Sequence, residues 1–173
     1  LHDPTYSESL KTIEERHLAA VKELIPVQVQ STVLSKIKSD LNVLETLLEG
    51  AYLIGELTPK LSDKIVSFGE LLSAYIIGEY FKSEGLDATF KDSRELIITD
   101  SNYGKANVDF SSTTKNCNQF FKETPCQITV LPGFVSSSST GDNTTLGRGG
   151  SDYTASVLGS VLSADAIEIW TDV

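Results

Sequence analysis

The chain has 173 residues, 40% of them hydrophobic, which is enough to bury the core of one globular domain. Lys and Arg number 14 against 24 Asp and Glu, and the resulting net charge of -10 disfavours nucleic acid and anionic membranes as partners without excluding a nucleotide. Cys117 and Cys126 lack metal-ligand spacing and only two histidines accompany them, so we expect no metal site but two reduced, buried thiols in a cytoplasmic protein.

The first third of the chain is predicted to be helical. Positions 5–8 have the form of a capping box, and apolar residues recur at helical spacing from there to Pro26. A second apolar repeat ends at Gly50, and Thr58 followed by Pro59 suits the start of another helix. We therefore interpret residues 1–66 as a helical region that precedes an α/β part over residues 67–173.

From residue 67 onward, the pattern alternates between helix and strand. The expected elements are helix 71–80, strand 88–90, strand 97–99, helix 111–121, strand 128–131, helix 153–163 and strand 166–170. This order favours a largely parallel sheet covered by helices. The segment SSSSTGDN at 136–143 is low in complexity, and its composition predicts a mobile loop.

The most informative segment is TTLGRGGSDYT at residues 144–154. Its three glycines within four positions allow positive φ angles and let the backbone approach a ligand closely. Arg148 offers a planar fork for a carboxylate and Asp152 can pair with an ammonium group, so the segment predicts a pocket for a small zwitterion. The alternative is a solvated turn that caps a helix, in which Ser151 or Asp152 bonds free N–H groups.

Four segments of the chain resemble the aspartokinases, members of the amino-acid kinase family. They are SFGE at 67–70, LPGF at 131–134, TTLGRGGSDYTA at 144–155, and AD followed by EIWTDV within 164–173. The resemblance implies a three-layer αβα sandwich with a largely parallel sheet, as in carbamate kinase-like folds. It also implies phosphorylation of the β-carboxylate of L-aspartate by ATP with Mg²⁺, which gives 4-phospho-L-aspartate on the route to lysine, threonine and methionine.

The resemblance also implies roles for individual residues around the substrate. Arg148 would hold the α-carboxylate of aspartate, with Ser151 nearby, while Glu70 and Asp152 would face the α-ammonium group. Asp152 is also the candidate catalytic residue, because it would orient a catalytic lysine. Without the resemblance, Glu70 fits a helix start, where the helix dipole favours a carboxylate.

Three further residues complete the set that the resemblance implies. Phe134 would form a wall beside aspartate, and Thr171 and Asp172 would begin the nucleotide site. The last two residues also fit a strand-ending turn or a helix cap. Both single aspartokinases and fusions to homoserine dehydrogenase match this pattern, and we expect a homo-oligomer.

The sequence departs from the family pattern at both ends, which predicts a partial kinase domain. The N-terminal strand with its Lys-Phe-Gly-Gly-Thr-Ser motif is missing, and so is the nucleotide-binding stretch expected after Val173. Without that lysine, the transferring phosphoryl group lacks its main protein cation, so we expect these residues alone to be inactive. The alternatives are another acyl-phosphate-forming kinase of the same fold, such as glutamate 5-kinase, and a non-catalytic regulatory or assembly module.

Overall fold

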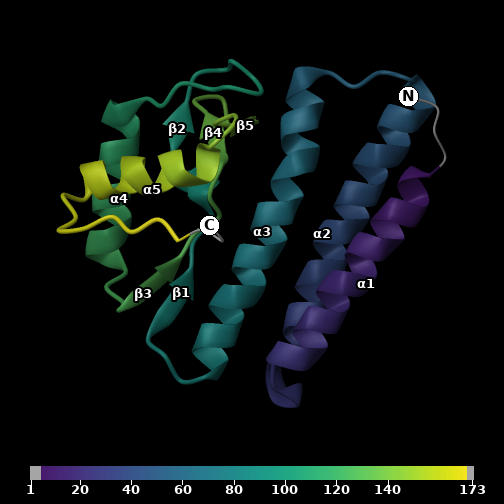
Figure 1. Ribbon diagram of the computed structural model, residues 1–173, viewed down its shortest axis with the longest axis horizontal. Coiled ribbons are helices and arrows are strands. Elements are labelled where there is room, and N and C mark those ends of the chain that lie inside the picture. Colours follow the sequence, from purple (N-terminus) through teal and green to yellow (C-terminus); the bar gives the residue numbers. More distant parts are fainter. Residues whose placement is uncertain (1–4, 171–173) are drawn as a thin grey trace.

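The computed structural model describes residues 5–170, and three long helices form its first half (Figure 1). These helices are α1 (Tyr6–Leu24), α2 (Val27–Ile54) and α3 (Pro59–Ser83). Pro26 separates α1 from α2, and α2 ends at Gly55, whose φ of 71° is left-handed. The Leu61 N–H donates to Thr58 Oγ1 at 3.2 Å, and this cap confirms the helix start predicted at Thr58 and Pro59.

The three helices pack around one apolar core. Its side chains recur at helical spacing, and each contributes roughly 1.5–3 kcal/mol when fully buried. Its buried members are Leu10, Val21, Ile25, Val33, Ile37, Leu41, Leu44, Phe68, Leu72 and Ile76. This core fixes α3 against α1 and α2 on one side, while the opposite side of α3 packs on the strands.

The strands form a central layer between α3 and two further helices (Figure 1). The elements of this part are β1 (Ala88–Phe90), a short 3-10 turn η1 (Ser93–Glu95), β2 (Ile98–Thr99), α4 (Phe110–Glu123), β3 (Ile128–Val130), β4 (Val135–Ser138), β5 (Asn143–Thr145) and α5 (Gly150–Val161). β1 pairs with β3 and β2 pairs with β4, both parallel, while β5 is antiparallel to β4. The predicted α/β sandwich with a largely parallel sheet is therefore confirmed.

The change of pattern at residue 67 is not a break in the structure. α3 runs without interruption through this position, so Glu70 lies in the middle of a helix and the predicted helix start there is wrong. The reason is that α3 packs on other elements along both sides, which spreads its apolar residues around the helix and obscures the repeat that reveals an amphipathic helix.

The serine-rich segment is a buried strand followed by a turn, and the prediction of a mobile loop over 136–143 is wrong. Ser136 is fully buried, and its hydroxyl lies 3.0 Å from Thr144 Oγ1. Ser137 Oγ donates to the Arg94 carbonyl, and Thr99 Oγ1 lies 2.7 Å from Thr144 Oγ1. Small hydroxyl side chains can fill a tightly packed sheet when partners satisfy them, so polar composition alone misled the prediction.

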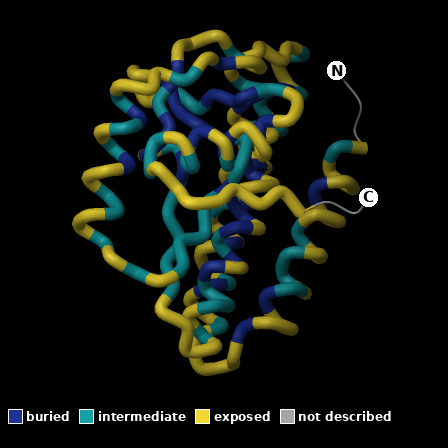
Figure 2. Tube along the Cα trace, turned by 60° about the vertical axis from the view of Figure 1, so that its left-hand side comes forward, coloured by how far each residue is buried: buried dark blue, intermediate teal, exposed yellow. Residues whose placement is uncertain are grey.

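Residues 166–170 form no strand with any other described segment. They run as an exposed stretch after α5 (Figure 2). Trp170 is 88% exposed. A single extended segment leaves its backbone groups unpaired, so sequence alternation alone does not make a strand. The prediction of a strand over 166–170 is therefore wrong for the described residues.

The two cysteines are both free. Cys117 is buried on α4, where loss of solvation raises the pKa of its thiol, whereas Cys126 is only partly buried. Cys126 Sγ lies 3.2 Å from Thr129 Oγ1. The prediction of reduced thiols agrees with this arrangement, but only one of the two is fully buried.

Candidate functional site

The glycine-rich loop turns the chain sharply from β5 into α5. Gly147 and Gly149 have φ angles of 75° and 73°, a conformation that side chains other than glycine adopt at a cost. The Gly150 N–H donates to the Gly147 carbonyl at 3.0 Å and closes the turn. Gly149 is the N-cap of α5 and no side chain caps this helix, so the alternative of capping by Ser151 or Asp152 is wrong.

The turn after β3 packs directly against this loop. A Cβ added to Gly150 would lie 2.8 Å from Phe134 Cδ2, and one added to Gly133 would lie 3.0 Å from Ser151 Cα. Phe134 itself has a φ of 68°, which is rare for a bulky residue. Its N–H donates to Thr154 Oγ1 at 2.9 Å, and this bond holds the strained residue in place. The structure therefore packs Gly133 and Phe134 against Gly150 and Ser151 at the start of α5.

Arg148, Ser151 and Asp152 present polar groups to solvent beside this contact. All three residues are exposed, and within residues 5–170 their side chains form no hydrogen bond or ion pair. The N–H groups of Ser151 and Asp152, in the first turn of α5, also have no backbone acceptor in this part of the chain. Free N–H groups and the positive end of a helix dipole attract an anion, so this site can receive a carboxylate.

Glu70 lies on a different element from the glycine loop. It is exposed on α3, and within the described part of the chain its carboxylate forms no hydrogen bond or ion pair. Asp63, seven residues earlier on the same helix, bonds Thr145 just before the glycine loop. Seven residues make about two helical turns, so Glu70 lies on the same side of α3 roughly 10 Å further along. The predicted nucleotide residues Thr171 and Asp172 lie outside the described residues.

Comparison with known proteins assigns the chain to a family. Residues 6–173 match the description "Amino acid kinase family". The chain belongs to this family. Within the described residues, no helix is long and apolar enough to cross a membrane, and no three His, Cys, Asp or Glu side chains are grouped to hold a metal ion.

Individual members of the amino acid kinase family are similar over most of the chain. The bifunctional aspartokinase/homoserine dehydrogenase 2 of Zea mays is 34% identical over 172 residues, which are 99% of this chain and 19% of that protein. Lysine-sensitive aspartokinase 3 of Escherichia coli is 35% identical over 136 residues, covering 75% of this chain and 30% of its own length. This chain therefore spans less than a third of either relative.

A solved amino acid kinase structure shares the fold closely. It is E. coli aspartokinase III in complex with aspartate and ADP, and it superimposes with a TM-score of 0.90 at 31% identity. The match covers 99% of this chain and 38% of the E. coli chain. The three helices and the α/β layer are thus arranged as in an aspartokinase.

The sequence did not reveal two buried residues that support the loop. Asp63 lies on the sheet-facing side of α3. Thr154 bridges α5 and the Phe134 turn, because its Oγ1 accepts the Phe134 N–H at 2.9 Å while its hydroxyl donates to the Gly150 carbonyl within α5 at 2.7 Å. The sequence does contain one indication that Asp63 is buried. It lies on the same helical face as Ser67, Ala74 and Gly78, which are small residues and are all buried. A carboxylate among buried small residues indicates a specific partner across the interface.

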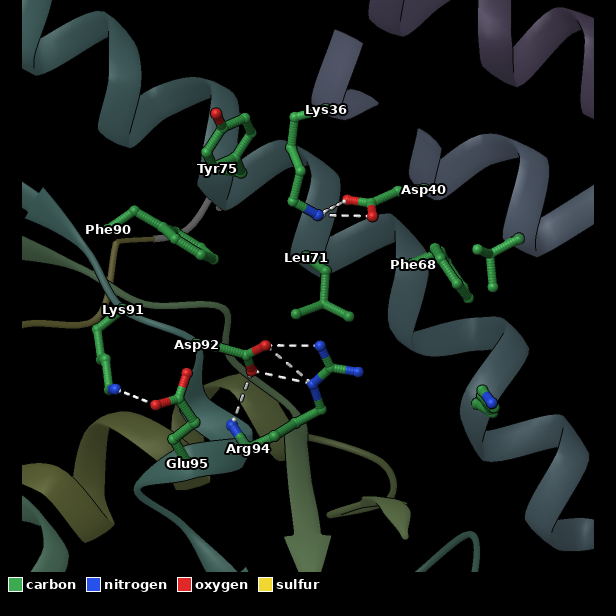
Figure 3. Close-up of a pocket in the computed structure, with 12 residues that line it drawn as sticks. Lys36, Asp40, Phe68, Leu71, Tyr75, Phe90, Lys91, Asp92, Arg94 and Glu95 are labelled. Atoms are coloured by element: carbon green, nitrogen blue, oxygen red, sulfur yellow. Dashed lines mark hydrogen bonds and ion pairs between the residues drawn. The ribbon is translucent and has the colours of Figure 1, made fainter. Parts of the chain in front are cut away.

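A separate cavity of about 480 Å³ lies between α2, α3 and residues 90–95 (Figure 3). Six of its charged side chains form three ion pairs: Lys36 with Asp40, Lys91 with Glu95, and Arg94 with Asp92. The pKa of Tyr75 in its wall is raised, first by burial and then by Glu79 and Asp40. Because none of the predicted site residues lines this cavity, we do not place the substrate there.

An ion pair anchors the turn between β4 and β5 to the start of α3. Lys60 Nζ lies 2.6 Å from Asp142 Oδ1, and the Tyr103 hydroxyl donates to Asp142 Oδ2 at 3.2 Å. The hydrogen bond from Lys60 is the main cause that lowers the pKa of Asp142, and the same bond raises the pKa of Lys60. The pair therefore stabilises the hairpin that leads into the glycine loop.

We predict that this stabilisation depends on pH. Because the pKa of Asp142 is lowered, its contribution is complete above the unfolded value of about 3.9 and is lost as pH falls through the folded value. Because the pKa of Lys60 is raised, its contribution is complete below about 10.4 and is lost as pH rises through the folded value. Asp142→Asn should therefore lower the free energy of unfolding equally across neutral pH, and less below about pH 4.

Urea denaturation of the wild-type and Asp142→Asn proteins between about pH 3 and pH 8 measures the difference in their free energies of unfolding. Urea is chosen because it is uncharged and does not screen the ion pair as a salt would. Glu49→Gln on α2 is the matched control, since it removes one exposed carboxylate with no ion pair in the described chain. A wild-type to Asp142→Asn difference that stays constant down to pH 3 would contradict the assignment.

Proposed function

We propose that this chain is the aspartate-binding part of an aspartate kinase. The observation that carries the proposal is the packing of the Phe134 turn on the loop from Gly147 to Asp152, which gathers a free guanidinium, a free carboxylate and free helix N–H groups. Its similarity to a solved aspartokinase bound to aspartate and ADP supports the same function.

In the proposed reaction, an oxygen of the β-carboxylate of L-aspartate attacks the γ-phosphorus of ATP. The bond between that phosphorus and the ADP oxygen breaks, and the products are 4-phospho-L-aspartate and ADP. Mg²⁺ arriving with ATP would supply charge neutralisation. The described residues form no acidic cluster that fits a metal ion by itself, so we assign them positioning and charge complementarity only.

Each predicted substrate residue within residues 5–170 has a role that its place in the fold supports. Arg148 would bind the α-carboxylate through two parallel hydrogen bonds beside the N-terminus of α5. Asp152 on α5 and Glu70 on α3 would face the ammonium group from two sides, and Asp152 would also orient the catalytic lysine. Phe134, which packs against Gly150, would form a wall beside aspartate, and Ser151 would lie near the α-carboxylate.

The charge pattern favours an amino acid with both α groups free over the alternative substrates. An acetylated amine would leave the carboxylates of Glu70 and Asp152 without a cation, which costs binding energy. Glutamate has one more methylene than aspartate, so a related acyl-phosphate-forming kinase such as glutamate 5-kinase would need a longer pocket. The cytoplasmic location and the homo-oligomer stay predictions, and the plant relative named above is described as chloroplastic.

A ligand titration followed by NMR tests the proposal. We expect L-aspartate to shift the backbone amide signals of Arg148 to Asp152 and of Phe134, and to leave those of α1 and α2 unchanged. N-acetyl-L-aspartate and succinate, which each lack the ammonium group, should bind at least roughly 10-fold more weakly. Equal shifts for all three ligands, or shifts confined to the cavity of Figure 3, would contradict the proposal.

A further inference from the structure

Asp63 is a buried carboxylate that holds two distant segments against α3. It is 3% exposed, and its Oδ2 accepts hydrogen bonds from the Thr145 N–H at 3.0 Å and the Gly104 N–H at 2.9 Å. Its Oδ1 accepts the Thr145 hydroxyl at 2.8 Å. No Lys or Arg forms an ion pair with it in the part of the chain that the structure describes, so these three donors alone offset the loss of hydration.

The two segments that Asp63 holds both reach the glycine loop. Thr145 is the last residue of β5, three positions before Arg148, and its carbonyl also accepts the Ala106 N–H at 2.9 Å. The Gly104 carbonyl lies so close to Gly147 that an added Cβ would approach it to 3.1 Å. Asp63 thus joins α3 to the chain just before Arg148 and to the turn beneath Gly147.

We propose that Asp63 is a positioning residue that fixes the glycine loop relative to α3, and thereby sets the separation of Arg148 from Glu70. This inference rests on the proposed function, in which those two residues hold opposite ends of one substrate. A fixed separation favours a ligand of one length, because an error of about 1 Å in placement can reduce efficiency by roughly 100-fold.

The hydrogen-bond inventory at Asp63 indicates which substitution preserves its role. In Asp63→Asn, one amide oxygen can accept both N–H groups, while the amide nitrogen can donate to Thr145 Oγ1, which also accepts. In Asp63→Leu, a side chain of similar shape offers no acceptor and leaves two N–H groups without a partner. The two variants therefore separate hydrogen bonding from shape and charge.

The experiment compares both variants with the wild-type chain for amide hydrogen exchange and L-aspartate affinity. We expect Asp63→Leu to speed exchange at the Thr145 and Gly104 amides by at least about 10-fold and to weaken L-aspartate binding about 10-fold. Asp63→Asn should stay within about threefold of wild type in both measurements. Val33→Ala in the α2 core is the matched control, because it lowers stability without touching the loop and should leave affinity unchanged.

Four results would count against the proposal. One is a folded Asp63→Leu protein that keeps wild-type affinity, and another is a loss of affinity in Val33→Ala equal to that in Asp63→Leu. If wild type does not bind L-aspartate, the proposed function fails, and unchanged exchange at Thr145 and Gly104 in Asp63→Leu then refutes the anchoring role separately.

A second variant applies if Asp63→Leu does not fold. Thr145→Val removes only the hydroxyl donor to Asp63, and we expect it to weaken L-aspartate binding about threefold. No loss of affinity in Thr145→Val would count against the positioning role.

Discussion

Replacing Arg148 with alanine is expected to weaken L-aspartate binding by roughly 100-fold, equivalent to about 2–3 kcal/mol. The guanidinium forms no ion pair within residues 5–170, so its charge is available to a ligand. It stands beside the N-terminus of α5, where the helix dipole adds to the attraction for a carboxylate. Isothermal titration calorimetry of the wild-type and Arg148→Ala proteins with L-aspartate measures the loss.

Two companion variants separate geometry from net charge. Arg148→Lys keeps the charge but loses the planar fork, so we expect an intermediate loss of about 10-fold. Lys115→Ala removes one exposed cation on α4, far from the loop in sequence, and should leave affinity unchanged. If Lys115→Ala weakens binding as much as Arg148→Ala, the attraction comes from overall charge and the assigned role of Arg148 is wrong.

Gly150→Ala is expected to destabilise the protein by about 1–3 kcal/mol and to abolish L-aspartate binding. The added Cβ would lie 2.8 Å from Phe134 Cδ2, 3.2 Å from Phe134 Cα and 3.2 Å from Leu146 Cβ. Phe134 cannot easily retreat, because its N–H is bonded to Thr154 and its carbonyl accepts the Leu146 N–H. The turn and the loop must therefore separate, which displaces Phe134 from the start of α5.

Gly50→Ala is the matched control for this substitution. Gly50 lies inside α2 with no atom within 4 Å of an added Cβ, so alanine there should stabilise the protein by about 0.5–1 kcal/mol. Thermal and urea unfolding of both variants gives the comparison. A Gly150→Ala protein as stable as Gly50→Ala, with intact L-aspartate binding, would show that the Phe134 turn and the loop are not tightly packed in solution.

Much of the fold could be predicted from the sequence because local patterns determine it. α1 and α2 carry clear apolar repeats, and Thr58 caps α3 where the sequence predicts its start. The end of α2 is predicted at Gly50, but the helix continues to Ile54 and ends at the left-handed Gly55. The middle of α3 was misread because that helix is buried on several sides. The serine strand was missed because its hydroxyls are satisfied by partners such as Arg94, 43 residues away, which a local pattern does not reveal.

The candidate site followed from the sequence only where its residues are contiguous. The loop from Gly147 to Asp152 was predicted from its glycines and charges, and the structure adds that Phe134 packs on it. Asp63 was not predicted, because its partner Thr145 is 82 residues away and no local repeat links them. Residues that bind a ligand stand out by their chemistry, whereas residues that hold them are recognised only from contacts across the fold.

The most direct test of the central claim is a crystal structure of this protein with L-aspartate. We predict that the α-carboxylate of the ligand lies on the Arg148 guanidinium beside the first turn of α5, and that its ammonium group lies between Asp152 and Glu70. L-aspartate bound in the cavity of Figure 3, or bound at the loop with its ammonium group turned away from both carboxylates, would contradict the account.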